Sequence, residues 1–284
     1  MTRYLVVGAG GMLGTDLQSV LADRDVTALA RAALDVTDAE AVTEAVEGHD
    51  VVINASAYTR VDDAETHEDE ALAINGTAVA HLARATAIHG AALVQISTDY
   101  VFDGTAKTPY PENFSRDPVC AYGRTKAEGE RMALGLNPDG TRIVRTAWLY
   151  GQHGSNFAST MLRLAGERDT VDVITDQLGQ PTWTMDLAAQ IVAMLDFGAP
   201  AGIYHGTNSG EATWFDFARE VFGLGGFDPE RVRPTDSAQF QRAAHRPSYS
   251  VLGHDQWTAV GLEPMREWKL ALRAAFDSRA LGAA

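Results

Sequence analysis

The sequence predicts an α/β protein built on a doubly wound parallel sheet, with a smaller mixed α/β lobe formed by its later segments. Short apolar runs recur along the first half of the chain, and stretches with helical spacing separate them. A glycine-rich turn directly follows the first run. With 284 residues, 45% of them hydrophobic, the chain is long enough to bury the core that such a fold needs.

The first half predicts the strands of the sheet. Its apolar runs are YLVVG, DVTALA, DVVINA, AALVQIS and TRIVRTAW, within residues 4–148. Each run is short and bounded by turn residues, and the stretches between them have room for crossover helices, as parallel strands require. The longest helical stretch, residues 62–90, begins with acidic residues and ends at Gly90, as the helix dipole and a C-terminal cap favour.

The pattern changes after Gly151. NFASTMLRLAGER predicts a helix, VDVITD a strand, and QLGQPTW a loop that leads into a helix near Met185. GIYHGTN then predicts a strand, TWFDFAREVF a helix, and the residues after Pro264 a final helix. We expect residues 1–150 to form the core and residues 151–284 mainly the smaller lobe, with segments near 171–197 returning to the core. No repeat or long linker occurs, so the two parts should share one body.

Composition excludes several classes of protein. The formal net charge of −15 would repel a phosphate backbone, so we expect no nucleic-acid partner. The only cysteine, Cys120, has no partner for a disulfide within the chain. The opening residues, MTRYLVVGAG, contain an apolar run far too short for a signal peptide or a membrane span. We therefore expect a cytoplasmic protein without a membrane partner.

Glycines at positions 8, 11 and 14 follow the first predicted strand, in GAGGMLGTDL. Glycine permits a tight turn and close approach of the backbone to a ligand. The helix that follows, which opens near Met12 and Leu13, would point its first amides at a pyrophosphate. Gly8, Gly11 and Gly14 thus predict a dinucleotide site in a Rossmann core; a plain glycine turn is the alternative.

The end of the second strand bears on the choice of cofactor. An NAD-binding fold usually places an acidic residue there, but Ala30 and Arg31 hold that place. An arginine can pair with a 2′-phosphate, which favours NADP(H) over NAD(H), unless Arg31 is simply a solvated surface residue. Asp35 and Val36 follow, and could reach the adenine; alternatively, Asp35 is a helix N-cap.

Polar residues end the fourth strand, in QISTDYVFDG. Ser97, Thr98, Asp99 and Tyr100 should lie at the carboxyl edge of the sheet, where ligands bind in open α/β sheets. A hydroxyl there can donate a hydrogen bond to a substrate carbonyl. The alternative is a Thr/Asp turn that satisfies only its own backbone.

The stretch AYGRTKAEGE places Tyr122 and Lys126 four residues apart, on one face of a predicted helix. A lysine ammonium can stabilise a developing phenolate and lower the tyrosine pKa, so that the tyrosine serves as a proton donor. A surface Tyr/Lys pair is the alternative for the spacing alone. The order of glycine turn, threonine, tyrosine and lysine is much more specific than any one of these features.

With these motifs the sequence resembles the extended branch of the short-chain dehydrogenase/reductase superfamily, and more closely its family of dTDP-4-dehydrorhamnose reductases. The resemblance covers nearly the whole chain. It rests on GAGGMLG, NASAYTRVDDAE, STDYVFDG, AYGRTKAEGE, RTAWLYG, the pair Asn156 and Phe157, the GQPT of residues 179–182, and RPSYSVL. It implies NADPH as the cofactor, with NADH possible, and a dTDP-sugar as the substrate.

The resemblance also implies roles for individual residues. Thr98 would hydrogen-bond the C4 carbonyl, Tyr122 would protonate the developing alkoxide, and Lys126 would tune Tyr122 and hold the nicotinamide ribose. Ala55 and Ala57 would be further cofactor contacts. The implied substrate contacts are Val61, Asp99, Tyr100 and Trp148 around the sugar, and Arg246 and Ser250 near the nucleotide diphosphate, with Asn156, Gln177 and Gln180 in the same cleft. Trp148 could equally be a core residue, because a Trp after a buried strand usually is.

One property of the family is not matched. Some of its reductases are dimers bridged by magnesium through glutamates at two places, where this chain has Asp16 and Met185. Methionine is a poor ligand for a hard cation, so we expect no such metal bridge and a monomer or a weak homodimer. The histidines show neither HxH nor HExxH spacing, and no G-x-S-x-G motif occurs.

The resemblance therefore implies NADPH-dependent reduction of the C4 ketone of dTDP-4-dehydro-6-deoxy-L-mannose to dTDP-L-rhamnose. One alternative is a sister dTDP-4-ketosugar reductase of streptose or antibiotic sugar synthesis. Another is a non-catalytic NADP-binding regulatory subunit, which would have no need of Thr98, Tyr122 and Lys126 together. An epimerase of the same superfamily would need a tightly held NAD, which Arg31 disfavours.

Overall fold

Six parallel strands form the central sheet of the computed structural model, which describes residues 1–281. The strand order is β10-β5-β4-β3-β1-β2. From β1 the strand order runs to β2 on one side and through β3, β4 and β5 on the other. Such a reversal of the strand order is that of a doubly wound sheet, and it confirms the predicted fold class. The strands are β1 (Arg3–Val7), β2 (Asp25–Leu29), β3 (Val51–Asn54), β4 (Ala92–Thr98), β5 (Thr141–Thr146) and β10 (Gly202–His205).

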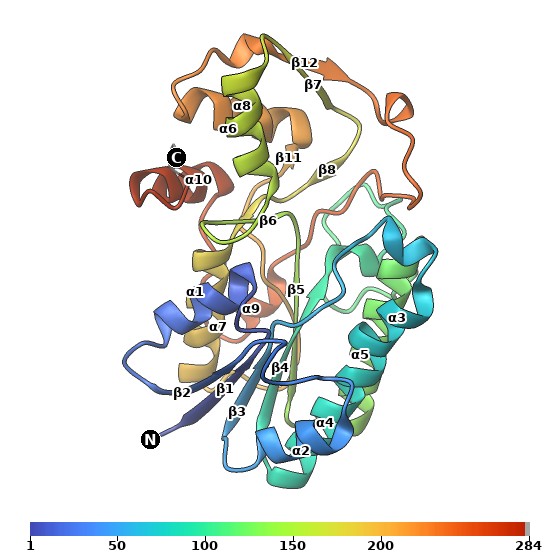
Figure 1. Cartoon of the computed structure of the whole chain (residues 1–284), viewed down its shortest axis with the longest axis vertical. Coiled ribbons are helices and arrows are strands. Elements are labelled where there is room, and N and C mark those ends of the chain that lie inside the picture. Colours follow the sequence, from blue (N-terminus) through green and yellow to red (C-terminus); the bar gives the residue numbers. More distant parts are fainter. Residues whose placement is uncertain (282–284) are drawn as a thin grey trace.

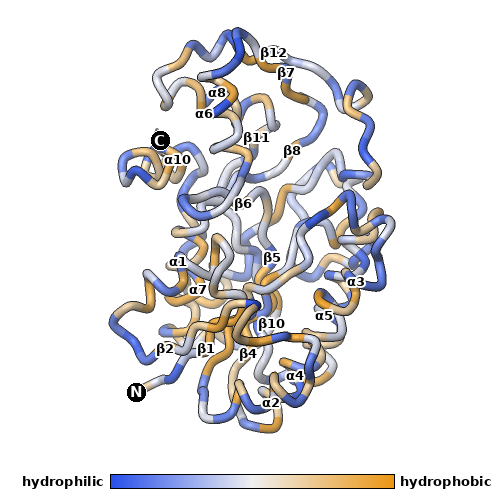
Figure 2. The backbone as a smooth tube through the Cα atoms, viewed as in Figure 1, coloured by the Kyte–Doolittle hydropathy of each residue, from blue (hydrophilic) through white to orange (hydrophobic). Residues whose placement is uncertain are grey.

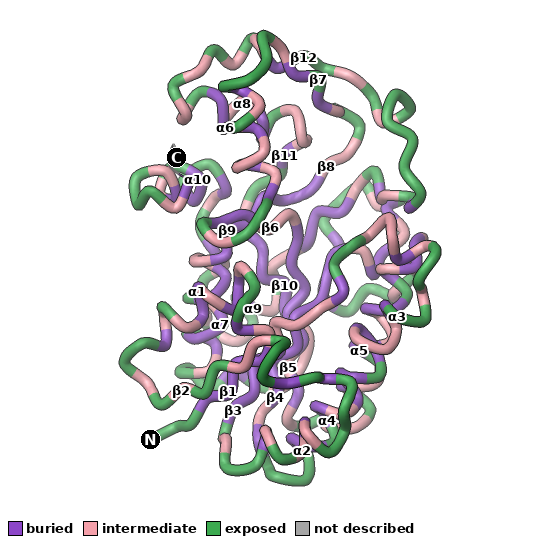
Figure 3. The backbone as a smooth tube through the Cα atoms, in the orientation of Figure 1, coloured by how far each residue is buried: buried purple, intermediate pink, exposed green. Residues whose placement is uncertain are grey.

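Helices cover both faces of this sheet (Figure 1). One face packs against α1 (Met12–Val20), α7 (Thr184–Asp196) and the short α9 (Asp255–Ala259). The other packs against α2 (Ala39–Val46), α4 (Ala78–His89) and α5 (Ala121–Leu136). Successive side chains of a strand point to opposite faces, so Val6 belongs to the first apolar core and Leu5 and Val7 to the second. The central strands are accordingly apolar and buried along their length (Figures 2 and 3).

The stretch predicted as one long helix is a series of shorter ones. It comprises the 3-10 turn η1 (Asp63–Glu65), α3 (Glu68–Leu72), the π-helical turn η2 (Ala73–Thr77) and α4. The series ends at Gly90, whose φ of +67° makes it the left-handed C-terminal residue that the sequence predicted. A Cβ on Gly129 of α5 would lie 2.0 Å from the carbonyl oxygen of Asn75, so a glycine is needed where α5 crosses η2.

A smaller lobe lies above the sheet in Figure 1. Its core is formed by α6 (Phe157–Glu167), α8 (Trp214–Leu224) and α10 (Trp268–Asp277). Short strand pairs join them: β7 (Val171–Ile174) with β12 (Val232–Thr235), β8 (Leu178–Gly179) with β11 (Ala212–Thr213), and β6 (Leu149–Tyr150) with β9 (Thr182–Trp183). Single 3-10 turns are η3 (Asp99–Val101), η4 (Pro229–Arg231) and η5 (Ser237–Gln239). Within residues 1–281, no helix has the length and apolar character needed to cross a membrane.

The late segments divide between the two parts differently from the expectation. The strand GIYHGTN, which we assigned to the smaller lobe, is β10, and it extends the main sheet by pairing with β5. Within residues 171–197, α7 returns to the core and packs against α1, but β7 stays in the smaller lobe beside β12. The core thus takes one of its two edge strands from residues beyond 200.

Candidate active site

A cleft of about 1080 Å³ opens at the carboxyl ends of β1, β3, β4 and β5, and residues of the smaller lobe line part of it. Most of the residues proposed from the sequence line this cleft. From the cofactor set it contains Gly8, Gly11, Met12, Leu13, Arg31, Asp35, Val36, Ala55, Ala57 and Lys126. From the catalytic and substrate sets it contains Thr98, Tyr122, Val61, Asp99, Tyr100 and Trp148. The structure thus brings residues from six separate stretches of the sequence to one place.

The glycine-rich turn is shaped by close backbone contacts. Gly8 has a φ of +79°, and a Cβ on it would lie 2.5 Å from the amide nitrogen of Ser56. Gly14 lies beneath the turn, where a Cβ would be 2.3 Å from the carbonyl oxygen of Gly8. Helix α1 begins at Met12, and no side chain caps its first amides. These open amides fit the diphosphate of a dinucleotide.

The residues after β2 lie at the far end of the cleft. Arg31 is exposed there, and Asp35 and Val36 lie nearby. The Asp35 carboxylate accepts hydrogen bonds from the amide (2.9 Å) and the hydroxyl (2.7 Å) of Thr37, and these bonds lower its pKa. The alternative that Asp35 caps a helix is wrong, because Asp38 is the N-cap of α2. An exposed guanidinium at this end fits a 2′-phosphate.

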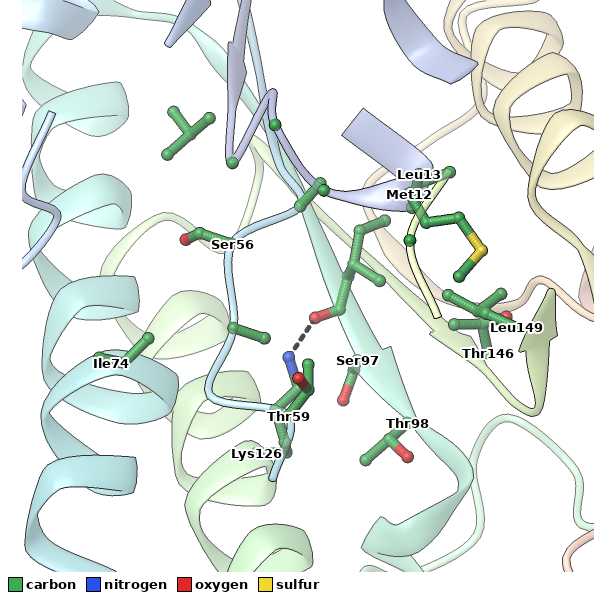
Figure 4. Close-up of a pocket in the computed structure, with 18 of the residues that line it drawn as sticks. Met12, Leu13, Ser56, Thr59, Ile74, Ser97, Thr98, Lys126, Thr146 and Leu149 are labelled. Atoms are coloured by element: carbon green, nitrogen blue, oxygen red, sulfur yellow. Dashed lines mark hydrogen bonds between the residues drawn. The ribbon is translucent and has the colours of Figure 1, made fainter. Parts of the chain in front are cut away.

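Thr98 is the last residue of β4, and its hydroxyl faces the cleft (Figure 4). Thr98 Oγ1 donates to Asp99 Oδ1 over 2.9 Å and accepts from the amide of Tyr100 over 3.1 Å. The side chain therefore takes part in the local turn that we gave as its alternative role, and it also lines the cleft. Lys126 and Ser97 lie beside Thr98, and Met12 and Leu13 lie across the pocket (Figure 4).

The start of α5 places Tyr122 beside Thr98. Gly123 makes this possible, because a Cβ there would lie 2.1 Å from the carbonyl oxygen of Tyr100. The ring of Tyr122 meets that of Tyr100 edge-on, with centroids 5.8 Å apart. Glu65 Oε1 accepts from the amide of Ala121 over 2.8 Å and so holds the first residue of the helix.

The ionisation of Tyr122 differs from the expectation. Burial raises the pKa of Tyr122, the Asp99 carboxylate raises it further, and hydrogen bonding with Thr98 lowers it in part. Lys126 Nζ instead donates to the carbonyl oxygen of Ile96 over 2.6 Å (Figure 4). The predicted lowering of the tyrosine pKa is therefore wrong for this state, because burial disfavours the phenolate more than its neighbours favour it. Tyr122 is neutral at neutral pH and carries the proton that a donor needs.

Lys126 and Asp99 are also shifted by burial. Burial lowers the pKa of Lys126 to about 8, against the opposing effect of Glu130, one helical turn away. Burial raises the pKa of Asp99 to about 6, although hydrogen bonds from Ser250 and Thr98 lower it. Asp99 is only 2% exposed, and its Oδ2 has no hydrogen-bond partner of ordinary geometry among residues 1–281.

Several proposed residues do not line the cleft. The Asn156 side chain caps α6, accepting from the amide of Ser159 (3.0 Å) and donating to the carbonyl of Gly151 (2.9 Å). Arg246 forms a two-point salt bridge with Asp62, at 2.9 and 2.8 Å. Substrate contact by Asn156, Arg246 and Ser250 stays a prediction, as it does for Gln177, which accepts from Trp214, and for Gln180, which is buried.

The two positions considered for a metal bridge have different surroundings. Asp16 is 2% exposed, with His153 Nε2 3.9 Å from its Oδ1. Met185 packs against the apolar core of the smaller lobe. Residues 1–281 contain no group of three or more histidine, cysteine, aspartate or glutamate side chains arranged to hold a metal ion.

Sequence reasoning missed other residues of the cleft. Thr146 could have been predicted from the sequence, because this residue ends β5 and pairs in register with Thr98. Residues of the lobe carried no such signal, since only the tertiary fold brings them to the sheet. The main residues missed are Ser56, Thr59, Ile74, Thr146, Leu149, His153, Ser155 and Trp214.

Comparison with known proteins agrees with this architecture. The family model described as RmlD substrate binding domain matches residues 2–280. A dTDP-4-dehydrorhamnose reductase from Streptomyces griseus is 51% identical, with 97% of this chain and 93% of the relative covered. A dTDP-4-keto-6-deoxy-D-glucose reductase from Streptomyces niveus is 50% identical, with 96% of both chains covered. The crystal structure of a dTDP-4-dehydrorhamnose reductase from Bacillus anthracis in complex with NADP superposes with a TM-score of 0.94 at 36% identity, covering 98% of this chain and all of that one. The chain belongs to the RmlD substrate binding domain family.

Proposed function

We propose that this protein is an NADPH-dependent oxidoreductase that reduces the C4 ketone of dTDP-4-dehydro-6-deoxy-L-mannose to dTDP-L-rhamnose. The observation that carries the proposal is the cleft itself. It holds Thr98, Tyr122 and Lys126 together at the sheet edge, next to the glycine-rich turn. Relatives named for this reduction share about half of the sequence, and one of the solved relatives holds NADP.

The chain's own residues would hold the cofactor along the cleft. The open amides at the start of α1 suit the diphosphate, Arg31 suits the 2′-phosphate, and Lys126 suits the nicotinamide ribose. Bound NADPH would supply the hydride. The small side chains of Ala55 and Ala57 leave the strand end after β3 open to the ligand.

Two donors would meet the negative charge that develops on the ketone oxygen. Tyr122 is neutral and holds its proton on Oη, so it can give that proton to the oxygen as the alkoxide forms. The hydroxyl of Thr98, already oriented by Asp99 and by the amide of Tyr100, can donate a second hydrogen bond. The ammonium of Lys126, one helical turn from Tyr122, would stabilise the resulting phenolate.

A sister dTDP-4-ketosugar reductase is the second candidate. The Streptomyces niveus relative, named for a different ketosugar, is as similar as the one named for dehydrorhamnose. The motifs of this cleft serve binding of the nucleotide, hydride transfer and hydrogen bonding to the carbonyl, and both reactions need all three. A non-catalytic regulatory subunit is less favoured, because it would not need the three catalytic groups at one place.

We also propose a cytoplasmic protein that works as a monomer or a weak homodimer, with no nucleic-acid or membrane partner. The net charge of −15 supports the exclusion of nucleic acid. The methionine at position 185, in place of a hard oxygen ligand, supports the absence of a metal-bridged dimer.

The test of function is NADPH oxidation with enzymatically prepared dTDP-4-dehydro-6-deoxy-L-mannose, with the product identified by NMR. Rapid oxidation that yields dTDP-L-rhamnose is the expected result. Bound NADPH without oxidation would contradict this substrate and direct the assay to a panel of other dTDP-4-ketosugars. Failure with the whole panel would favour a regulatory subunit.

A further inference from the structure

Two tryptophans from distant parts of the chain stack on each other at the wall of the cleft. Trp148 follows β5, and Trp214 is the first residue of α8. Their ring centroids are 3.6 Å apart and their planes differ by 9°. Both side chains line the cleft. The pair therefore joins the sheet edge to the smaller lobe at the site itself.

The backbone of Trp148 adopts a conformation that is unfavourable for a bulky residue. Its φ is +46°, in the left-handed region, where a bulky residue is strained unless its surroundings hold it. Its carbonyl oxygen accepts from the amide of Thr182 over 3.2 Å. Gly179 supplies the space for the indole, because a Cβ there would lie 2.6 Å from Cε2 of Trp148. Such strain at a ligand cleft points to a positional requirement for this indole.

Trp214 is itself held firmly. A capping box of Thr213 and Asp216 fixes the start of α8. The indole nitrogen of Trp214 donates to Gln177 Oε1 over 3.2 Å, and the ring of Phe157 lies against it with centroids 4.6 Å apart. Trp214 therefore presents a fixed aromatic face to Trp148.

The location of the pair indicates which part of a ligand it serves. Thr146 pairs in register with Thr98, and Trp148 lies two residues beyond Thr146. Trp148 thus follows directly after the sheet edge that carries the Thr98 hydroxyl, which we propose binds the substrate carbonyl. The C–H faces of a deoxysugar are apolar, and the part of the Trp148 indole that Trp214 and Gly179 leave uncovered offers them a rigid apolar contact surface.

We propose that Trp214 is a positioning residue for the sugar: by stacking on Trp148, it holds that indole as the wall against which the hexose packs. This inference rests on the proposed function, because it requires a nucleotide-sugar in the cleft. It makes a specific claim, namely that Trp214 acts through Trp148 and affects the sugar but not the nucleotide.

Calorimetry with dTDP-L-rhamnose and with dTDP alone tests the claim in the full-length protein. Trp214→Leu should lower the affinity for dTDP-L-rhamnose about tenfold and change the affinity for dTDP by less than about twofold. Trp214→Phe keeps an aromatic face and should restore most of the loss. Phe222→Leu is the matched control, because Phe222 is a fully buried aromatic residue of the same helix that does not line the cleft. It should lower thermal stability and leave both affinities unchanged.

The double variant Trp148→Leu/Trp214→Leu separates positioning from direct contact. If Trp214 acts through Trp148, the double variant should lose no more affinity for the sugar than Trp148→Leu alone. Additive losses would overturn the inference, as would an unchanged affinity for dTDP-L-rhamnose in Trp214→Leu. A wild-type protein that fails to bind dTDP-L-rhamnose would overturn the proposed function as well, so the two failures are distinguishable.

Discussion

Tyr122 shows how burial determines the form in which a reacting group is stored. Its pKa is raised by the loss of water and by the nearby charge of Asp99, so it retains its proton until a stronger base appears beside it. A ketone oxygen that accepts hydride becomes such a base. The tyrosine therefore need not be acidic in the resting protein in order to act as a proton donor.

Replacing Tyr122 with Phe should leave NADPH affinity within about twofold of wild type and lower kcat by two or more orders of magnitude, roughly the contribution of a general acid. The ring and its edge-on contact with Tyr100 are kept, and only the hydroxyl is lost. Fluorescence titration of NADPH and steady-state turnover measure the two effects. Near-normal turnover would remove Tyr122 from its role as acid.

Asp99 predicts a dependence of stability on pH. Its pKa rises from an ordinary 3.8 to about 6 on folding, so the folded state binds the proton more tightly than the unfolded state. The free energy of unfolding should then fall as pH rises between these two values. Asp99→Asn keeps an oxygen for Thr98 and removes the buried charge, so it should be more stable than wild type by up to about 3 kcal/mol near pH 8. The gain should vanish below about pH 4.

Asp103→Asn is the control of opposite sign. Hydrogen bonds from Thr105 lower the pKa of Asp103, so its charged form stabilises the fold above the unfolded pKa. This variant should lose stability near neutral pH and approach wild type in acid. Urea unfolding of both variants across pH checks the pair, and a loss of stability in Asp99→Asn near pH 8 would contradict the argument.

Arg31 should discriminate between the two nicotinamide cofactors. It is an exposed cation at the end of the cleft that we assign to the adenosine. Arg31→Ala should raise KM for NADPH about tenfold or more and change KM for NADH little, because only NADPH carries the 2′-phosphate. Equal losses with both cofactors would mean that Arg31 does not contact the phosphate.

Among the elements, the junction of β1 and α1 depends most strictly on glycine. A Cβ on Gly14 would lie 2.3 Å from the carbonyl oxygen of Gly8, whereas one on Gly10 would meet only the Cβ of Ala30, at 3.6 Å. Gly14→Ala should therefore displace the turn and cost about 1–3 kcal/mol of stability. It should also lower the affinity for NADPH about tenfold or more. Gly10→Ala should change stability by less than about 0.5 kcal/mol. Thermal unfolding and NADPH titration test both, and normal NADPH affinity in Gly14→Ala would contradict this account.

The elements also show what a sequence can predict and why. The first five strands, the glycine turn, Thr98 and the Tyr122–Lys126 pair each belong to a local pattern of a few residues. The strand GIYHGTN, which is β10, was predicted in the same way, but its place in the main sheet was not, because that place depends on pairing with residues 142–145 of β5, about sixty positions earlier. Trp214 was missed for the same reason: the fold of the smaller lobe, rather than a motif, brings it to the cleft.

Across the whole molecule, the core and the smaller lobe are joined by a salt bridge. Asp62 comes from the segment after β3, and its carboxylate accepts from both terminal nitrogens of Arg246 and from the amide of Ala244. Hydrogen bonding from Arg246 lowers the pKa of Asp62 to about 2. A carboxylate whose pKa is lowered on folding stabilises the fold at any pH above its unfolded pKa. That stabilisation is lost only as the pH falls through the folded pKa. The bridge is therefore intact at any physiological pH.

This bridge makes a competition testable. The resemblance assigns Arg246 to the diphosphate of the substrate, but its guanidinium is paired with Asp62 in the structure. If the diphosphate must displace Asp62, then Asp62→Asn should raise the affinity for dTDP about threefold to tenfold, and Arg246→Ala should lower it. Arg242→Ala is the control, because Arg242 makes one 3.5 Å contact with Asp62 and its side chain is 57% exposed, so affinity should hardly change. Calorimetry with dTDP decides the question: weaker binding in Asp62→Asn would mean that the carboxylate holds Arg246 in place for the diphosphate, and that the two lobes come to the ligand already joined.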